Sequence, residues 1–254
     1  MTRMGCQRAW LVAAAASAAV VNLGNAARAA EVDSSRWLDI ESRIQYAYYT
    51  EDRRTLQSIA TSLTTDTTSG AERPYYLALA SYRLADLADP HQPQQAKQPA
   101  SRCAESLEKS SGSTPAPAER FALESACLRV LAALEPLRGP YLAMRSGSAL
   151  KHALELAPRD PRILLLSALA DRDRRENPAV VTRELREATA AFEREREDVD
   201  RVPGWGAAEA YAFLGRALLE QGQTLAARSA LEHALLLVPD FALAHRLMAR
   251  ITAG

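Results

Sequence analysis

Residues 211–239 read YAFLGRALLEQGQTLAARSALEHALLLVP, and this stretch decides the fold. Its apolar residues recur at helical spacing on either side of Gly222, which predicts two helices joined by a short turn. Gly215 and Ala227 are small enough for the two helices to approach closely, and Pro239 ends the second helix. The spaced positions are Tyr211, Leu214, Gly215, Leu218, Ala227, Leu231, Ala234 and Pro239.

This spacing resembles the tetratricopeptide repeat, in which an aromatic residue, Leu-Gly, an aromatic or Leu, Ala, a bulky apolar residue, Ala and Pro occur at these offsets. The resemblance implies an all-α fold, namely a right-handed α-solenoid of about five antiparallel helix pairs with a C-terminal capping helix. It also implies a protein that binds other proteins rather than one that catalyses a reaction.

A second copy of part of this stretch lies upstream. Residues 148–158 match residues 229–239 at eight of eleven positions and precede them by 81 residues. The resemblance is strong over residues 140–252, moderate over 72–136 and weak before that. The first helices are therefore either diverged repeats or an unrelated helical cap.

Helix-breaking residues, mainly proline and glycine, divide the rest of the chain after residue 34 into segments with helical spacing, and no alternating strand pattern occurs. Short links between helices of this length predict antiparallel neighbours. The predicted helices are 34–49, 51–63, 72–89, 94–110, 117–136, 140–157, 160–176, 178–199, 204–222, 224–237 and 239–252. In the last of these, one apolar stripe predicts a helix that caps the array with its other face in solvent.

Residues 1–29 have the features of a cleavable secretory signal peptide. Arg3 and Arg8 form a short positive segment before an apolar run at 10–21, and Ala27-Arg28-Ala29 is a typical cleavage sequence. An uncleaved membrane anchor is the alternative, but this run is short against the ~20 residues that span a bilayer. The sequence predicts cleavage after Ala29, a mature repeat domain over 30–254, and a periplasmic or secreted protein with no stable membrane anchor.

Charge argues against a nucleic-acid partner. The chain has 31 basic and 31 acidic residues, and loss of residues 1–29 removes three arginines and no acidic residue. Neither the full chain nor the cleaved chain has an excess of positive charge that would favour binding to a polyanion. The run at 193–198 alternates Glu and Arg, and we interpret it as a solvated helix surface rather than a recognition patch.

Catalytic and metal-binding motifs are missing from the sequence. It has no nucleophile elbow, phosphate-binding loop, His-Glu-x-x-His or paired Cys-x2-Cys. His152 and His233 occupy the same place in the two copies, with no histidine or cysteine three or four residues away. We therefore expect no metal, no cofactor and no enzymatic activity, and we interpret the histidines as surface residues.

Cys103 and Cys127 are the two cysteines that remain after signal cleavage. They lie on successive predicted helices, at similar distances from the loop between them. In an oxidising compartment they could form a disulfide. The alternative is two buried thiols packed in a helix seam.

In tetratricopeptide arrays the first helix of each pair lines the concave wall, so the resemblance implies a groove. The implied groove residues are Glu209, Ala212, Arg216, Leu219 and Glu220 in the best-matched unit, and Pro161, Leu164, Ala168, Asp171 and Arg172 in the preceding one. A mixed face of Arg, Glu and small apolar residues suits an extended or helical peptide. Alternatively, these residues are ordinary solvated helix surface.

These observations favour a non-catalytic scaffold of the bacterial cell envelope that binds a protein or peptide through the groove. The main alternative is a structural or accessory subunit held permanently in an envelope assembly. An exported helical enzyme is a distant third possibility.

Overall fold

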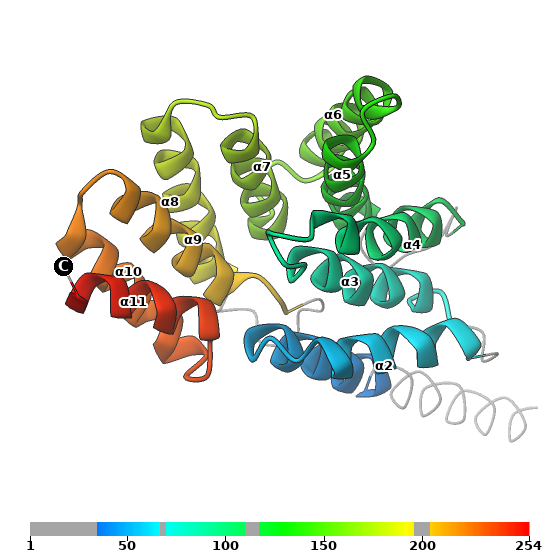
Figure 1. The fold of residues 1–254 in the computed structure, drawn as a ribbon, viewed down its shortest axis with the longest axis horizontal. Coiled ribbons are helices and arrows are strands. Elements are labelled where there is room, and N and C mark those ends of the chain that lie inside the picture. The colour runs from blue at the N-terminus through cyan, green and yellow to red at the C-terminus, as the bar shows by residue number, and fades with distance from the viewer. Residues whose placement is uncertain (1–34, 67–69, 110–116, 196–203, 254) are drawn as a thin grey trace, which may run out of the picture. The chain divides into compact units, whose positions relative to one another are not determined.

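The structure is a computed structural model that describes residues 35–66, 70–109, 117–195 and 204–253, and these residues contain helices and no strand (Figure 1). The all-α prediction is confirmed. Residues 35–49 are helical. The helices after them are α2 (Arg53–Thr65), α3 (Arg73–Asp86), the short 3-10 helix η1 (Pro93–Ala96), α4 (Lys97–Lys109), α5 (Pro117–Leu134), α6 (Gly139–Leu156), α7 (Pro161–Asp173), α8 (Pro178–Glu195), α9 (Ala207–Glu220), α10 (Thr224–Leu237) and α11 (Ala242–Ala253). The predicted signal peptide lies outside the described residues.

Proline and capping residues explain where several helices begin. Pro117, Pro161 and Pro178 are the first residues of α5, α7 and α8, where the missing N–H costs no hydrogen bond. Before α7, the buried carboxylate of Asp160 accepts hydrogen bonds from the backbone N–H groups of Arg162 (2.9 Å) and Ile163 (3.3 Å). The sequence therefore specified these boundaries closely.

The helix predicted from residue 204 begins later, at Ala207. Gly206 has a φ of 113°, a conformation that glycine adopts without strain, and a Cβ there would lie 2.5 Å from Cζ of Phe192. The irregular segment places the Trp205 side chain in the core, where its Nε1 donates to the Tyr75 hydroxyl at 2.8 Å. Burial of this indole explains the late start.

Consecutive helices pack against each other through most of the chain. The described residues from Ile40 onward belong to one compact unit, and all packing discussed below lies within it. Its most extensive interhelical contacts join α5 to α6, α9 to α10, α3 to α4, and α7 to α8. Each of these four combinations joins two α-helices that follow each other in the chain.

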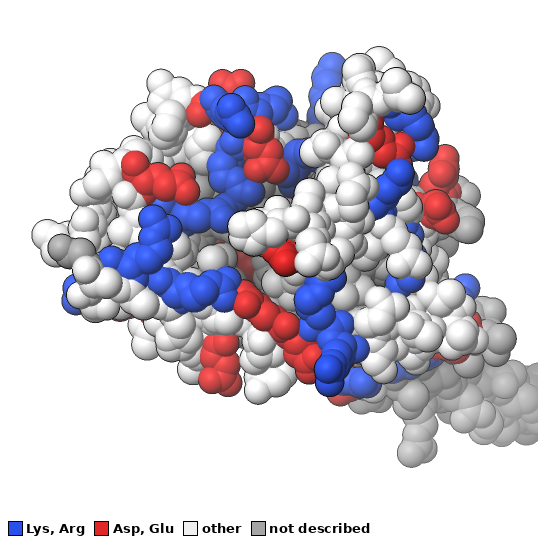
Figure 2. Space-filling model, viewed as in Figure 1, with Lys and Arg blue, Asp and Glu red and all other residues white. Residues whose placement is uncertain are grey.

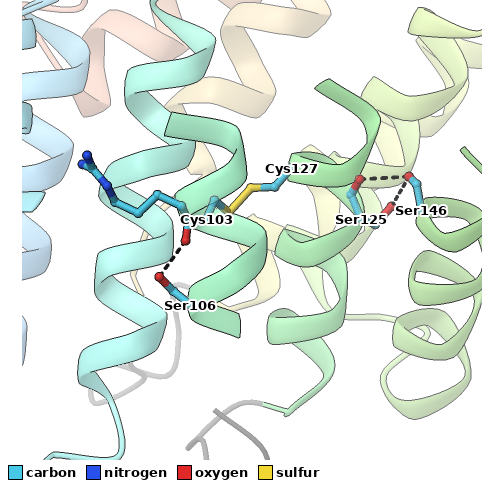
Figure 3. Close-up of a disulfide and its surroundings, with 6 residues drawn as sticks. Cys103, Ser106, Ser125, Cys127 and Ser146 are labelled. Atoms are coloured by element: carbon cyan, nitrogen blue, oxygen red, sulfur yellow. Dashed lines mark hydrogen bonds between the residues drawn. A yellow bond between two sulfur atoms is a disulfide. The ribbon is translucent and has the colours of Figure 1, made fainter. Parts of the chain in front are cut away.

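Two of these pairs share the same local contacts. His233 of α10 stacks on Tyr211 of α9 at 5.1 Å between ring centroids, and His152 of α6 meets Phe121 of α5 edge-on at 4.4 Å. Four residues after each aromatic, a small residue lies where the helices approach. Gly215 lies against Ala227 in α9 and α10, and the Ser125 and Ser146 hydroxyl groups are 3.0 Å apart in α5 and α6 (Figure 3). The sequence copy therefore corresponds to a structural one.

Replacing Gly215 by leucine should lower the free energy of unfolding by about 1–3 kcal/mol. Even a Cβ at this position would lie 2.6 Å from Cγ of Leu231 and 3.3 Å from the carbonyl oxygen of Ala227. Chemical denaturation measures the change. The matched control is Gly147→Leu on exposed α6 surface, where a Cβ meets nothing within 4 Å. Equal unfolding midpoints for the two variants would contradict the close packing of α9 on α10.

Cys103 and Cys127 are joined by a disulfide, with their Cα atoms 6.1 Å apart. The bond links α4 to α5, while Ser125, two residues before Cys127, faces α6 on the other side of α5 (Figure 3). Both cysteines are fully buried. Helix α5 is thus fixed covalently on one side and by buried hydroxyl groups on the other.

The first and last helices of the compact unit are in contact. Tyr48 and Tyr49 share a buried cluster with residues of α9, α10 and α11, and the Phe241 ring lies 4.8 Å from the Tyr49 ring. Arg246 of α11 also pairs with Glu51. The prediction that the last helix caps the array is therefore incomplete, because residues 40–51 cover part of that helix.

Candidate ligand-binding cleft

Two of the expected groove residues on α9 are not exposed. Glu209 and Ala212 are both 0% accessible, and the prediction that they belong to an open face is wrong. The cause is the chain's own helix at residues 40–49. Its Tyr49 hydroxyl donates to Oε2 of Glu209 at 2.7 Å, and Tyr48 and Tyr49 share the apolar cluster that contains Ala212. In α7, Pro161 and Ala168 are buried as well.

Glu209 belongs to a buried polar network that connects distant parts of the chain. It forms an ion pair with Arg83 of α3, whose guanidinium also donates to Gln45 and lies 4.1 Å from the Tyr48 ring centroid. Burial is the largest single effect and lowers the pKa of Arg83, but Glu209 together with Tyr48, Tyr49 and Tyr82 raises it by more, so the net pKa lies above its usual value. This network is a structural connection, because its charges are paired with each other and are closed to solvent.

Glu41, which lies on the same helix as Gln45 and Tyr48, makes a comparable buried connection. Its carboxylate accepts from the backbone N–H of Gly204 at 2.6 Å and from the Tyr76 hydroxyl at 3.2 Å. Burial raises its pKa, although these hydrogen bonds oppose the increase. Residues 40–49 are thus held by α3, by the segment before α9 and by α9 itself.

A different arrangement occurs at the other end of α9. Arg216 of α9 and Arg172 at the end of α7 both lie against the Phe213 ring, 4.8 and 5.4 Å from its centroid. The sequence had placed Arg172 and Arg216 in the groove on separate units, and the structure brings them to one aromatic side chain. The sequence interpretation missed Phe213, since the repeat signature assigns no role to that position.

The two guanidinium groups have incomplete hydrogen bonding. Arg172 donates from Nε and Nη2 to Oδ1 of Asp173, but its buried Nη1 has no partner. Arg216 makes no hydrogen bond or ion pair with any described residue, and its Nη2 is buried. Burial lowers the pKa of Arg216 below its usual value, and the distant carboxylates of Glu220 and Asp86 only partly offset this effect. This half-buried guanidinium has one buried nitrogen and forms no hydrogen bond or ion pair with the described residues, so the Phe213 ring and these carboxylates compensate its charge only in part.

Two cavities meet at this arginine pair. The first, of about 520 Å³, is bordered by α3, α9, α11 and the loop after α3, and the second, of about 230 Å³, by the ends of α7, α8 and α9. Arg172, Phe213 and Arg216 line both. We call the two cavities together the arginine cleft. On the face shown in Figure 2, basic side chains border a hollow with acidic side chains along one edge.

Most other charges in the larger cavity already have partners. Arg53 donates to the carbonyl oxygens of Leu84 and Leu87, and Arg246 pairs with Glu51. Asp86 accepts from the Tyr48 hydroxyl at 2.6 Å. Four arginines and three acidic residues line this cavity, so one positive charge is in excess. Arg216 is the arginine among them that has neither an ion pair nor a hydrogen bond within the described part of the chain.

A third cavity, of about 460 Å³, adjoins the cleft. Ala88, Asp89 and Pro90 line both this cavity and the larger one of the cleft. Its remaining walls are mostly apolar and include Pro93, Ala96, Val130, Ala133 and Leu134. A charged site and a mainly apolar site, whose lining also contains Arg129, Asp173 and Arg174, are therefore neighbours along one loop.

The other expected groove residues are dispersed. Glu220 lines the smaller cavity of the cleft. Asp171 pairs with Arg174, and both line a separate cavity of about 570 Å³ at α6 and α7. Leu219 packs against the apolar cluster of α9–α11, and Leu164 is partly buried in α7. The structure thus gathers Arg172, Arg216 and Glu220 into one site and places the others elsewhere.

Within the described ranges, no group of His, Cys, Asp and Glu is arranged to hold a metal ion, and all four histidines are exposed. The helices in these ranges are also too short or too polar to cross a bilayer. No protein-family model matches the chain, and no curated protein matches it.

Proposed function

We propose that this protein is an exported, tetratricopeptide-like scaffold that binds a protein or peptide segment of the bacterial cell envelope without catalysis. Its helix pairs form a right-handed solenoid of five pairs followed by α11. Two observations support this arrangement. The helices pack mainly with their chain neighbours, and α5/α6 repeat the aromatic–histidine and small-residue contacts of α9/α10.

Export is supported by the sequence of residues 1–29 and by the Cys103–Cys127 disulfide. Structural disulfides persist in the periplasm and outside the cell and are rare in the cytosol of mesophiles. The protein therefore acts in an oxidising compartment, where its partner is a component of the envelope or an exported protein.

The observation that carries the binding proposal is the state of Arg216. Its Nη2 is buried, and it forms no ion pair or hydrogen bond with the described residues although it lines a cavity, whereas a residue that served only to hold α9 in place would be expected to have such a partner. The binding surface is accordingly the arginine cleft rather than the whole face of the first helices, since residues 40–49 cover the rest of α9.

Reversing both charges, in Arg216→Glu with Glu220→Arg, should reduce capture of envelope proteins at least tenfold without changing helicity, because charge pairing across an interface sets both encounter and retention. Immobilised mature protein and an envelope extract provide the assay, read by quantitative mass spectrometry. The matched control is Arg228→Glu with Glu232→Arg, an exposed pair on α10 with the same four-residue spacing.

Equal loss of capture in both double variants would point to a nonspecific charge effect and contradict the cleft as the binding surface. Normal capture by the Arg216/Glu220 variant would do the same. In that case, changes on the outward helix faces that abolish capture would favour the permanent accessory subunit.

A further inference from the structure

The chemistry of the arginine cleft restricts the kind of ligand it takes, and this inference rests on the proposed function. The larger cavity carries one positive charge in excess, and its acidic residues would repel a highly charged ligand. A polyanion is therefore a poor match. A single negative charge matches the excess of one positive charge in the larger cavity.

The arrangement of the hydrogen-bond donors in the cleft restricts the class of ligand further. Arg172 and Arg216 share the Phe213 ring and both border the two cavities of the cleft, so that one ligand group can reach both guanidinium groups. A guanidinium presents two parallel N–H donors that match the two oxygen atoms of a carboxylate. The side chain of Asp173 already occupies one edge of Arg172, whereas Arg216 is free of acceptors among the described residues.

The apolar cavity beside the cleft provides a second point of recognition. It is reached across Ala88, Asp89 and Pro90, which line both cavities. An extended chain can therefore place a carboxylate at the arginines and an apolar side chain in this cavity. Apolar pockets with a few fixed polar groups are the usual form of a specific ligand site.

We propose that the arginine cleft recognises an extended peptide segment by one carboxylate, held by Arg172 and Arg216, and by a nearby aliphatic side chain seated beside Pro90 and Val130. We assign the carboxylate to an internal Asp or Glu side chain, because Ala88, Asp89 and Pro90 border both sites and the backbone of an extended segment can run along them. A free C-terminus has the same chemistry, and the experiment below separates the two sources.

The probes are fluorescent peptides of alanine and serine that contain one leucine and one glutamate. The glutamate lies one to five residues from the leucine, and both peptide termini are blocked so that they carry no charge. Each has a glutamine counterpart, and a further set carries glutamine with a free C-terminal carboxylate. We expect at least one blocked glutamate peptide to bind tenfold or more tightly than its glutamine counterpart, because a hydrogen-bonded charge is replaced by a neutral group. Equal binding of the blocked pairs would overturn the proposal, as would binding confined to the free C-terminus.

Variants of the protein locate the two contacts. Arg216→Met and Arg172→Met should each weaken binding of the selected glutamate peptide at least tenfold and leave the glutamine counterpart unchanged. Ala133→Phe, at an exposed position on the wall of the apolar cavity, should remove the preference for leucine over alanine and keep the preference for glutamate. Arg228→Met on exposed α10 is the control and should change neither.

Stability provides a readout that separates a ligand-binding arginine from a structural one. Since Nη2 of Arg216 is buried without a hydrogen-bond partner among the described residues, Arg216→Met should leave the melting temperature of the peptide-free protein unchanged or raise it. A lower melting temperature together with weaker binding of both peptides would assign Arg216 a packing role and overturn the proposal. If no peptide discriminates glutamate from glutamine while the Arg216/Glu220 reversal still abolishes capture of envelope proteins, the scaffold function stands and the carboxylate proposal fails.

Discussion

Replacing Glu209 by alanine is expected to lower the free energy of unfolding by about 3–5 kcal/mol. Side-chain exposure is 3% for Arg83 and 0% for Glu209, so the variant leaves a buried guanidinium without its counter-ion. It also removes the acceptor of the Tyr49 hydroxyl. Urea denaturation measures the loss. The control is Arg138→Ala in the Arg138–Glu135 pair, where Arg138 is 65% exposed, and it should change stability by less than about 1 kcal/mol.

A double-variant cycle tests whether the pair or the packing is responsible. Arg83→Met combined with Glu209→Leu should be far less destabilising than either of these two changes alone, because neither member of the ion pair then remains buried without the other. If Glu209→Ala unfolds at the same urea concentration as Arg138→Ala, the ion pair does not hold residues 40–49 on α9.

The second large effect concerns the disulfide. Reduction should lower the free energy of unfolding by about 3 kcal/mol, because the bond closes a loop across 24 positions of the chain and limits the unfolded state. Denaturation with and without reductant measures this effect on the same sequence. The variant with both Cys103→Ala and Cys127→Ala should be insensitive to reductant and serves as the control. A free-thiol assay of the denatured, unreduced protein that detects both cysteines would contradict the bond.

The positions of the helices were largely predictable because their determinants are local. Pro117, Pro161 and Pro178 favour the first turn of a helix wherever they occur, and Gly222 ends α9 with a φ of 72°. The small residues at 215 and 227 also identified a close contact through spacing alone. Such signals need no information from other parts of the chain.

The burial of Glu209 could not be predicted in this way. A glutamate in the first turn of an amphipathic helix usually faces solvent, and its partners Arg83 and Tyr49 are 126 and 160 residues away in the sequence. The weak repeat signature of residues 34–49 also gave no indication that they would cover α9. Long-range packing therefore decided which part of the expected groove stayed open.

The cleft was predicted only in part for a related reason. Arg172 and Arg216 were both among the groove residues predicted for two successive units, but Asp86, Phe241 and Arg246 come from segments outside those units. The sequence signal for the site is Phe213, an aromatic residue three positions before Arg216 on the same helix. Which charges find partners depends on the folded chain, and among the described residues Arg216 forms neither an ion pair nor a hydrogen bond.

The contact between residues 40–49 and the last helices has a consequence for how the protein folds and unfolds. In an array whose units touch only their neighbours, the ends fray first and folding spreads from any point. Here Tyr48 and Tyr49 share one cluster with Phe241, so detachment of α11 exposes the N-terminal aromatic side chains at the same time. The two ends of the compact unit therefore open together. Folding must in turn close a loop of almost the entire chain, and this closure slows folding relative to an array with local contacts alone.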